Sequence, residues 1–129
     1  MAVFSKEQQN SVWEKGIIVD GYDPNIVRKD ACGAWILKSK YDVHDSPFGW
    51  QIDHIYPASK LFSMGMSQEL IDDLQNLRPL NIRNYISKKD DYPIYKAVMT
   101  SKDNENIDCN DIKQVNLKLQ AILKQLYKL

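Results

Sequence analysis

Residues 50–60, WQIDHIYPASK, decide how the rest of the chain is interpreted. The bulky Trp50 and Ile52 alternate with polar residues, and this period of two predicts a short, half-buried strand. A proline follows closely, so we expect the strand to end just after the pair Asp53-His54. Adjacent residues on a strand point to opposite faces. The backbone must therefore turn here, or the pair must straddle a site, if both side chains serve one function.

The bulk composition is that of one globular domain. The chain has 129 residues, of which 43% are apolar and 26% charged, so we expect a single domain over residues 1–129. Its formal net charge of zero argues against a surface that binds polyanions over its whole extent, but it permits a local basic face. Cys32 and Cys109 form no C-x-x-C pair, so a cysteine zinc site is not expected.

The chain shows no sign of a targeting or membrane segment. Its first ten residues, MAVFSKEQQN, lack the order of a signal peptide, and no apolar run approaches the roughly 20 residues that span a membrane. We therefore expect a cytoplasmic protein with reduced thiols and no membrane partner.

Short elements are predicted around the strand at 50–55. They are a helix over 5–16 opened by a Ser5-x-x-Gln8 capping box, a strand over 34–37, a helical turn beginning at Ser67, a strand over 76–80 and a helix over 81–91. Pro79 lies in the predicted strand 76–80, which suits an edge strand or a strand end.

The C-terminal segment has the clearest helical pattern. Apolar residues spaced three, four, three and four apart predict a helix over about 111–128; they are Ile112, Val115, Leu119, Ile122 and Leu126. The preferred interpretation is a terminal helix packed on its own domain. The alternative is a dimer helix, since the spacing is that of a coiled-coil seam, although it covers only about two heptads.

Asp53 and His54 carry the chemistry that the sequence suggests. A carboxylate is a hard oxygen ligand that suits Mg²⁺ or another divalent cation, and a neutral histidine can take a proton from water. No second cluster of metal ligands is visible, which favours a mechanism with one metal.

Basic residues follow this pair along the chain and favour a phosphate partner. Residues 78–89 contain four cations and no acid, with one more cation in the preceding loop; they are Arg78, Arg83, Lys88, Lys89 and Lys60. A basic helix face is commonly only a solvated surface. Beside the Asp53-His54 pair, a face that tracks a nucleic-acid backbone becomes the preferred interpretation.

The segments DHIYP (53–57), NLRPL (76–80) and SKK (87–89) together resemble the HNH nuclease family, whose fold is the ββα-metal, or His-Me finger, fold. Upstream stretches such as VWEKG, GYDP and RKDACGAWI are also similar to small bacterial members. The resemblance covers residues 31–90. It implies an α+β domain in which a ββα-metal core is flanked by N- and C-terminal helices.

The resemblance also implies a role for each matching residue. His54 corresponds to the general base, Asp53 to a ligand of one divalent metal, and Asn76 to the residue that holds the loop and orients the histidine by hydrogen bonds. The metal is expected to be Mg²⁺, with Mn²⁺ or Zn²⁺ as alternatives. The expected activity is endonucleolytic hydrolysis of nucleic acid, with DNA favoured over RNA.

One position departs from the family pattern. The family places its last metal ligand, an Asn or His, nine residues after the middle Asn, and that position is Tyr85 here, with Asn84 one residue early. One residue on a helix rotates a side chain by about 100°, so Asn84 ligates only if the preceding turn is shorter. A phenolate ligand is costly. We therefore rank Asn84 ahead of Tyr85, with water as a third candidate.

Two other functions stay open at this stage. Tyr85 at the ligand position suggests a degenerate nuclease fold that binds nucleic acid or a protein without catalysis. A toxin-type nuclease with an inhibitor partner is a further alternative. No separate recognition domain is visible, so a specificity partner or weak sequence preference is expected.

Overall fold

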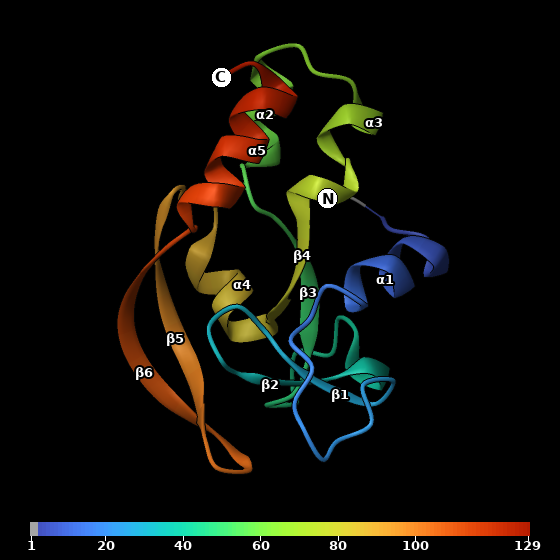
Figure 1. Cartoon of the computed structure of the whole chain (residues 1–129), viewed down its shortest axis with the longest axis vertical. Coiled ribbons are helices and arrows are strands. Elements are labelled where there is room, and N and C mark those ends of the chain that lie inside the picture. The colour runs from blue at the N-terminus through green and yellow to red at the C-terminus, as the bar shows by residue number, and fades with distance from the viewer. Residues whose placement is uncertain (1–2) are drawn as a thin grey trace.

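The computed structural model describes residues 3–129, which form an α+β protein with small antiparallel sheets (Figure 1). In chain order its elements are α1 (Lys6–Trp13), β1 (Val27–Lys29), β2 (Trp35–Leu37), η1 (Lys38–Lys40), β3 (Trp50–His54), α2 (Ala58–Ser63), α3 (Gln68–Ile71), η2 (Leu74–Asn76), β4 (Leu77–Asn81), α4 (Ile82–Lys88), β5 (Ile94–Lys102), β6 (Glu105–Gln114) and α5 (Leu117–Tyr127). Strands pair as β1 with β2, β3 with β4 and β5 with β6. Within residues 3–129, every helix is too short or too polar to cross a membrane.

The centre of the molecule is a strand–strand–helix unit made by β3, β4 and α4. β3 and β4 are antiparallel, with Ile52 opposite Pro79 and Asp53 opposite Arg78. The helix α4 begins directly after β4, because the Asn81 side chain accepts the backbone N–H of Arg83 at 3.1 Å and so caps its first turn. The strands expected near 50–55 and 76–80 and the helix after them are confirmed, with α4 ending at Lys88.

Both faces of the β3–β4 ribbon are covered, so the expected half-burial of β3 is wrong. One apolar cluster joins Trp50, Ile52 and Leu77 to the helix α1, and a second joins Ile55 and Leu80 to β5 and α5. Figure 1 shows α1 on one side of the ribbon and α4 with the β5–β6 hairpin on the other. The polar positions of β3 are therefore buried with the apolar ones.

The helix α1 is capped and docked as the sequence indicates. Ser5 Oγ accepts the backbone N–H of Gln8 at 3.0 Å, and Gln8 Oε1 accepts the Ser5 N–H at 2.8 Å, which completes the capping box. Trp13 fixes the other end, since its ring lies 5.3 Å from that of Trp50 and its Nε1–H donates to the Pro24 carbonyl.

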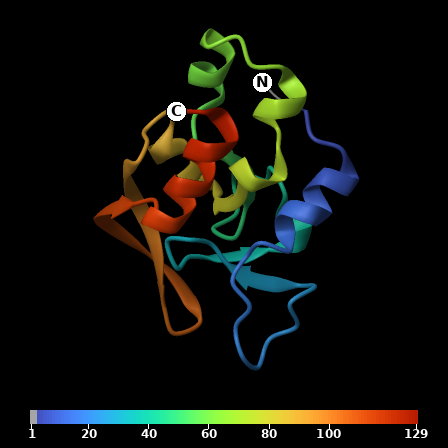
Figure 2. The same cartoon turned by 45° about the horizontal axis from the view of Figure 1, so that its top comes forward.

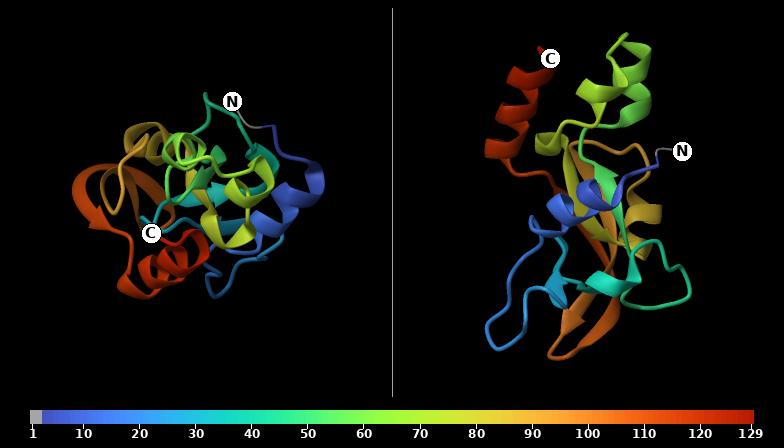
Figure 3. Two further views of the ribbon diagram at one scale, coloured as in Figure 1. Left: turned by 90° about the horizontal axis from the view of Figure 1, so that it is seen from above. Right: turned by 90° about the vertical axis from the view of Figure 1, so that its right-hand side faces the viewer.

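The C-terminal helix begins later than expected, which corrects the helix over 111–128. Residues 105–114 form β6, which pairs with β5 as a long hairpin, and Ile112 lies on β6 with 71% of its surface exposed. Backbone pairing with β5 satisfies this segment, and Asn116 then caps α5 by accepting the Leu119 N–H. Figures 2 and 3 show α5, in red, at the same end of the molecule as α2 and α3.

A close backbone approach at Gly49 joins three segments. A Cβ added to Gly49 would lie 1.9 Å from the Val43 carbonyl oxygen, so no larger residue fits. The Gly49 carbonyl also accepts the backbone N–H of Ile82 at 2.8 Å. The loop before β3, the start of β3 and the start of α4 are thus held at one point.

Candidate functional site

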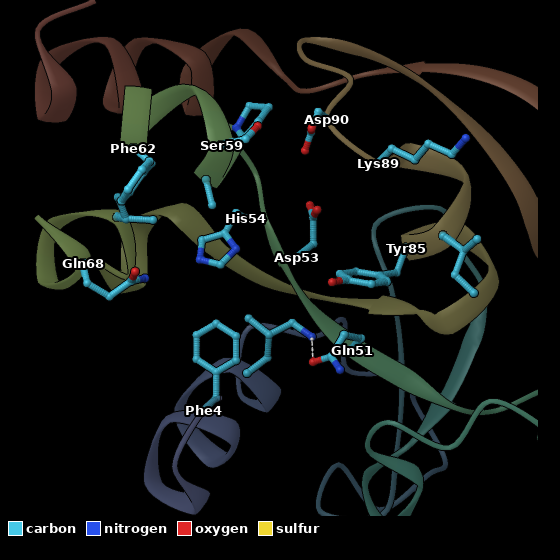
Figure 4. Close-up of a pocket in the computed structure, with 15 residues that line it drawn as sticks. Phe4, Gln51, Asp53, His54, Ser59, Phe62, Gln68, Tyr85, Lys89 and Asp90 are labelled. Carbon is cyan, nitrogen blue, oxygen red and sulfur yellow. Dashed lines mark hydrogen bonds between the residues drawn. The ribbon is translucent and has the colours of Figure 1, made fainter. Parts of the chain in front are cut away.

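A pocket of about 600 Å³ opens at the end of β3, and we call it the central pocket. Its lining includes Phe4, Asp53, His54, Phe62, Gln68 and Tyr85. Figure 4 shows Asp53, His54 and Tyr85 pointing into the same space, with Gln68 beyond the imidazole and Lys89 and Asp90 on the opposite rim. Asp53 and His54 both line this pocket although neighbours on a regular strand point to opposite faces. They can do so because β3 ends at His54.

The carboxylate of Asp53 lies at the floor of the pocket between two cations. Arg78, its cross-strand neighbour, donates from Nε to Oδ2 at 3.1 Å, and Lys88 at the end of α4 places Nζ 3.2 Å from Oδ1. Asp53 is 3% exposed and Lys88 is wholly buried. Lys88 Nζ also donates to the carbonyls of His54 and Ile55. The helix α4 is therefore tied to the strand end that carries the site.

Burial and charge shift the pKa values of both cations. Burial lowers the pKa of Lys88, with Asp53 opposing that change. Burial also disfavours the charged form of Arg78, but the nearby Asp53 and Tyr95 outweigh it and raise the pKa of the guanidinium. Arg78 lies 5.1 Å above the Tyr95 ring, and its second terminal nitrogen has no hydrogen-bond partner among residues 3–129.

The imidazole of His54 is held by a second carboxylate. Its Nε2 lies 2.7 Å from Oδ1 of Asp72, and both side chains are largely buried. Gln68 donates to the other oxygen of Asp72 at 3.0 Å. The Phe4 ring lies 5.7 Å from the imidazole and covers part of it. The ring orientation is therefore fixed from two sides.

Asn76 holds the loop that leaves β3. Its Oδ1 accepts the backbone N–H of Tyr56 at 2.7 Å, and its Nδ2 donates to the carbonyls of Tyr56 and Ile71. The Asn76 carbonyl accepts the N–H of Ile55 at 2.8 Å. This completely buried residue braces the backbone on both sides of the pocket and does not touch the His54 ring itself.

Asn84 does not reach the central pocket, which corrects the preference for it as a metal ligand. Its Nδ2 donates to Asp30 and to the Met99 carbonyl, and its Oδ1 accepts the N–H groups of Val98 and Met99. All of its hydrogen-bonding capacity is used in tying α4 to β5 and to Asp30, which follows β1. Tyr85, one residue on, faces the pocket because of the rotation along the helix.

Tyr85 is a poor ligand in its present state. Burial raises the pKa of its phenol, and the negative charges of Asp53, Asp42 and Asp90 raise it further. The phenol therefore stays protonated around neutral pH and presents a weak donor oxygen to a cation.

The five cations expected on one basic face are not all exposed. Arg78 and Lys88 are buried, and both pair with the carboxylate of Asp53. Arg83 pairs with Asp108 at 2.8 Å on the surface. Lys60 on α2 and Lys89 after α4 remain exposed, and Lys89 lines the pocket. Of the five cations, two exposed lysines are thus left without an ion pair among residues 3–129, and one of them, Lys89, lines the pocket.

The donor set fits a hydrated Mg²⁺ and does not fit Zn²⁺. Residues 3–129 contain no group of three or more His, Cys, Asp or Glu side chains placed to hold one ion, whereas protein zinc sites use three or four such ligands. Magnesium keeps several waters and is often held by one or two carboxylates together with substrate phosphates. A carboxylate accepts about four hydrogen bonds, so the two contacts of Asp53 leave capacity toward the pocket.

Sequence reasoning missed Asp72, Phe4 and Gln68 as parts of the site. Asp72 and Gln68 were included only in a predicted helical turn, and Phe4 precedes the predicted first helix. No spacing rule connects these residues to His54, because they meet it only through the fold. In comparisons with known proteins, no protein-family model, curated protein or solved structure matches the chain.

Proposed function

We propose that the chain is an HNH-type nuclease with a ββα-metal core, which hydrolyses DNA phosphodiester bonds with His54 as the general base and one divalent cation at Asp53. One observation carries the proposal: Asp53 and His54, consecutive residues at the end of β3, both line one pocket inside a strand–strand–helix unit. A base and a cation-binding carboxylate side by side are the smallest set that hydrolysis of an anionic ester requires.

The chain's own groups have distinct tasks in this proposal. The imidazole of His54 takes a proton from the attacking water, and Asn76 keeps the strand end rigid beneath it. The cation, preferably Mg²⁺, supplies positive charge to the phosphate when it is bound. Arg78 and Lys88 lie behind Asp53, so their charges also favour an anionic substrate while reducing the affinity for a free cation.

The mouth of the pocket suits a nucleic-acid backbone. Lys60 and Lys89 are exposed and lie on α2 and directly after α4, the two helices that border the pocket. Phosphate contacts from such lysines position a strand without reading its sequence. We therefore propose weak sequence preference for the isolated chain, or a partner that supplies specificity.

The decisive experiment compares the chain's two histidines. His54→Ala removes the base and is expected to lower Mg²⁺-dependent plasmid cleavage by at least about 100-fold. His44→Ala is the matched control, since His44 is exposed and, within the described residues 3–129, bonds only to Asp42, 2.9 Å away. Circular dichroism should show both variants folded. Equal cleavage rates for the His54→Ala variant and the parent would reject the mechanism.

A specific observation favours a second candidate, a catalytically inactive module that binds nucleic acid or a protein. Each carboxylate oxygen of Asp53 already contacts a cation, and Tyr85 offers a protonated phenol where a further ligand would be expected. Calorimetry separates the candidates. DNA binding that persists with no heat from Mg²⁺ or Mn²⁺, even with DNA present, would support the module.

A further inference from the structure

The hydrogen bond between His54 and Asp72 has a direct consequence for the proposed chemistry. Asp72 Oδ1 lies 2.7 Å from Nε2 of His54. An ionised carboxylate only accepts hydrogen bonds, so Nε2 must carry the proton of the neutral ring. Nδ1 is then unprotonated and can accept a proton from water. Nδ1 has no hydrogen-bond partner among residues 3–129, and His54 lines the central pocket.

Asp72 is itself firmly held. It ends the short helix α3, whose first turn Ser67 caps and whose Ile71 is buried in the core. Gln68 donates to the oxygen of Asp72 that His54 does not use. The last carbonyls of α3 are anchored too, since the Tyr127 hydroxyl donates to the Leu70 carbonyl at 2.9 Å. The carboxylate therefore has little freedom to leave the imidazole.

We propose that Asp72 is a positioning residue for His54: it fixes the imidazole in the tautomer with Nε2 protonated, directs Nδ1 into the central pocket as the proton acceptor, and stabilises the positive charge that the ring gains when it takes a proton. Asp72 does not line the pocket, so it acts through His54 alone. This inference rests on the proposed nuclease function for its catalytic consequence, but the tautomer is a property of the folded chain by itself.

The first test reads the tautomer without any activity. In ¹⁵N NMR of the full chain at mildly alkaline pH, the wild type should show His54 with Nε2 protonated and Nδ1 bare, with an exchange-protected Nε2–H. Asp72→Ala should lose that protected proton. Asp73→Asn is the matched control, because Asp73 neighbours Asp72, contacts the Gln75 backbone and can keep that cap as Asn. A wild-type ring protonated on Nδ1 would overturn the inference, even if the nuclease function holds.

The second test is a double-mutant cycle on cleavage rate. Asp72→Asn should lower kcat about 100-fold with little change in KM, because the amide lacks the charge and can donate to Nε2. Asp73→Asn should stay within about twofold of wild type. Adding Asp72→Asn to His54→Ala should cause no further loss, because both act through one imidazole.

The outcomes separate the two proposals. Independent losses that multiply in the double variant would show that Asp72 acts other than through His54 and would overturn the inference. A wild-type chain with the Nε2–H tautomer but no cleavage of any nucleic acid would reject the nuclease function and the catalytic part of the inference, while it would support the Asp72–His54 geometry.

Discussion

Two carboxylates are buried to nearly the same extent, yet their surroundings are opposite. Asp30 is 1% exposed and Asp53 3% exposed. Asp30 accepts four hydrogen bonds from uncharged donors, which are the backbone N–H groups of Cys32, Ala34 and Asn81 and the Nδ2 of Asn84. Asp53 instead contacts two cations, Arg78 and Lys88, and borders an open pocket.

The difference separates a structural carboxylate from a candidate functional one. A carboxylate has about four acceptor positions, and those of Asp30 are filled by groups from the turn before β2, from β4 and from α4. Asp53 retains capacity, and it borders a pocket that water and a cation can enter. Burial alone therefore does not distinguish the two roles, whereas the kind of partner does.

Exchanging each carboxylate for its amide should give the largest contrast. We expect Asp53→Asn to lower Mg²⁺-dependent cleavage about 1,000-fold, because the cation loses its charged ligand. Asp30→Asn should change the rate less than about threefold but lower the free energy of unfolding by about 3 kcal/mol, since two buried N–H donors lose their acceptor. Cleavage assays and urea denaturation measure the two effects.

Asp53→Asn will also weaken the fold, because Arg78 and Lys88 lose a counter-charge. Rates must therefore be measured where circular dichroism shows each variant folded. If Asp30→Asn removed cleavage as completely as Asp53→Asn while folded, the distinction between the two carboxylates would fail.

Manganese gives a more local test of the same contrast. Mn²⁺ added to the ¹⁵N-labelled chain should first broaden the amide signals of residues 52–56 and 85–90, and those of residues 30–34 only later. Asp53→Asn should require about tenfold more Mn²⁺ for the same broadening. Broadening that begins around Asp30 would place the cation elsewhere.

Changes at Tyr85 should give the smallest effects, and they test whether the phenol in the central pocket acts as a ligand of the cation. Because burial raises the pKa of Tyr85, its protonated phenol contributes little as a ligand, and Tyr85→Phe should change the cleavage rate less than about twofold. Tyr85→Asn places a carboxamide oxygen in the pocket and should improve Mg²⁺ affinity about threefold. Calorimetry with DNA present measures this. A large loss in Tyr85→Phe would instead make the phenol a ligand.

The sequence predicted the central unit well because local signals agree there. Alternation in 50–54, the proline-containing strand over 76–80 and the helical stretch after it all indicate elements that the structure contains. The β5–β6 hairpin was missed, because Ile112 and Val115 fit a helical spacing by coincidence with α5. The alternation of Tyr95, Ala97 and Met99, all buried, was the available strand signal.

The site was predictable only where its residues adjoin in sequence. Asp53 and His54 are found from their pairing, but whether Asn84 or Tyr85 faces them depends on the rotation of α4 by one residue. Asp72 approaches His54 only because α3 is anchored to the core through Ile71 and Tyr127. Such contacts depend on tertiary packing, which no spacing in a single sequence encodes.

The close backbone approach at Gly49 determines which segments must be transferred together to rebuild this pocket in another protein. A designer who transplants β3, β4 and α4 onto another scaffold must also carry the loop from Tyr41 to Gly49, because the Val43 carbonyl occupies the space of any side chain at position 49. The same glycine accepts the N–H that starts α4. A graft that begins at Trp50 would lack the Gly49 contacts that hold the start of β3 against the start of α4. Lys88, at the end of α4, would then no longer be held against Asp53.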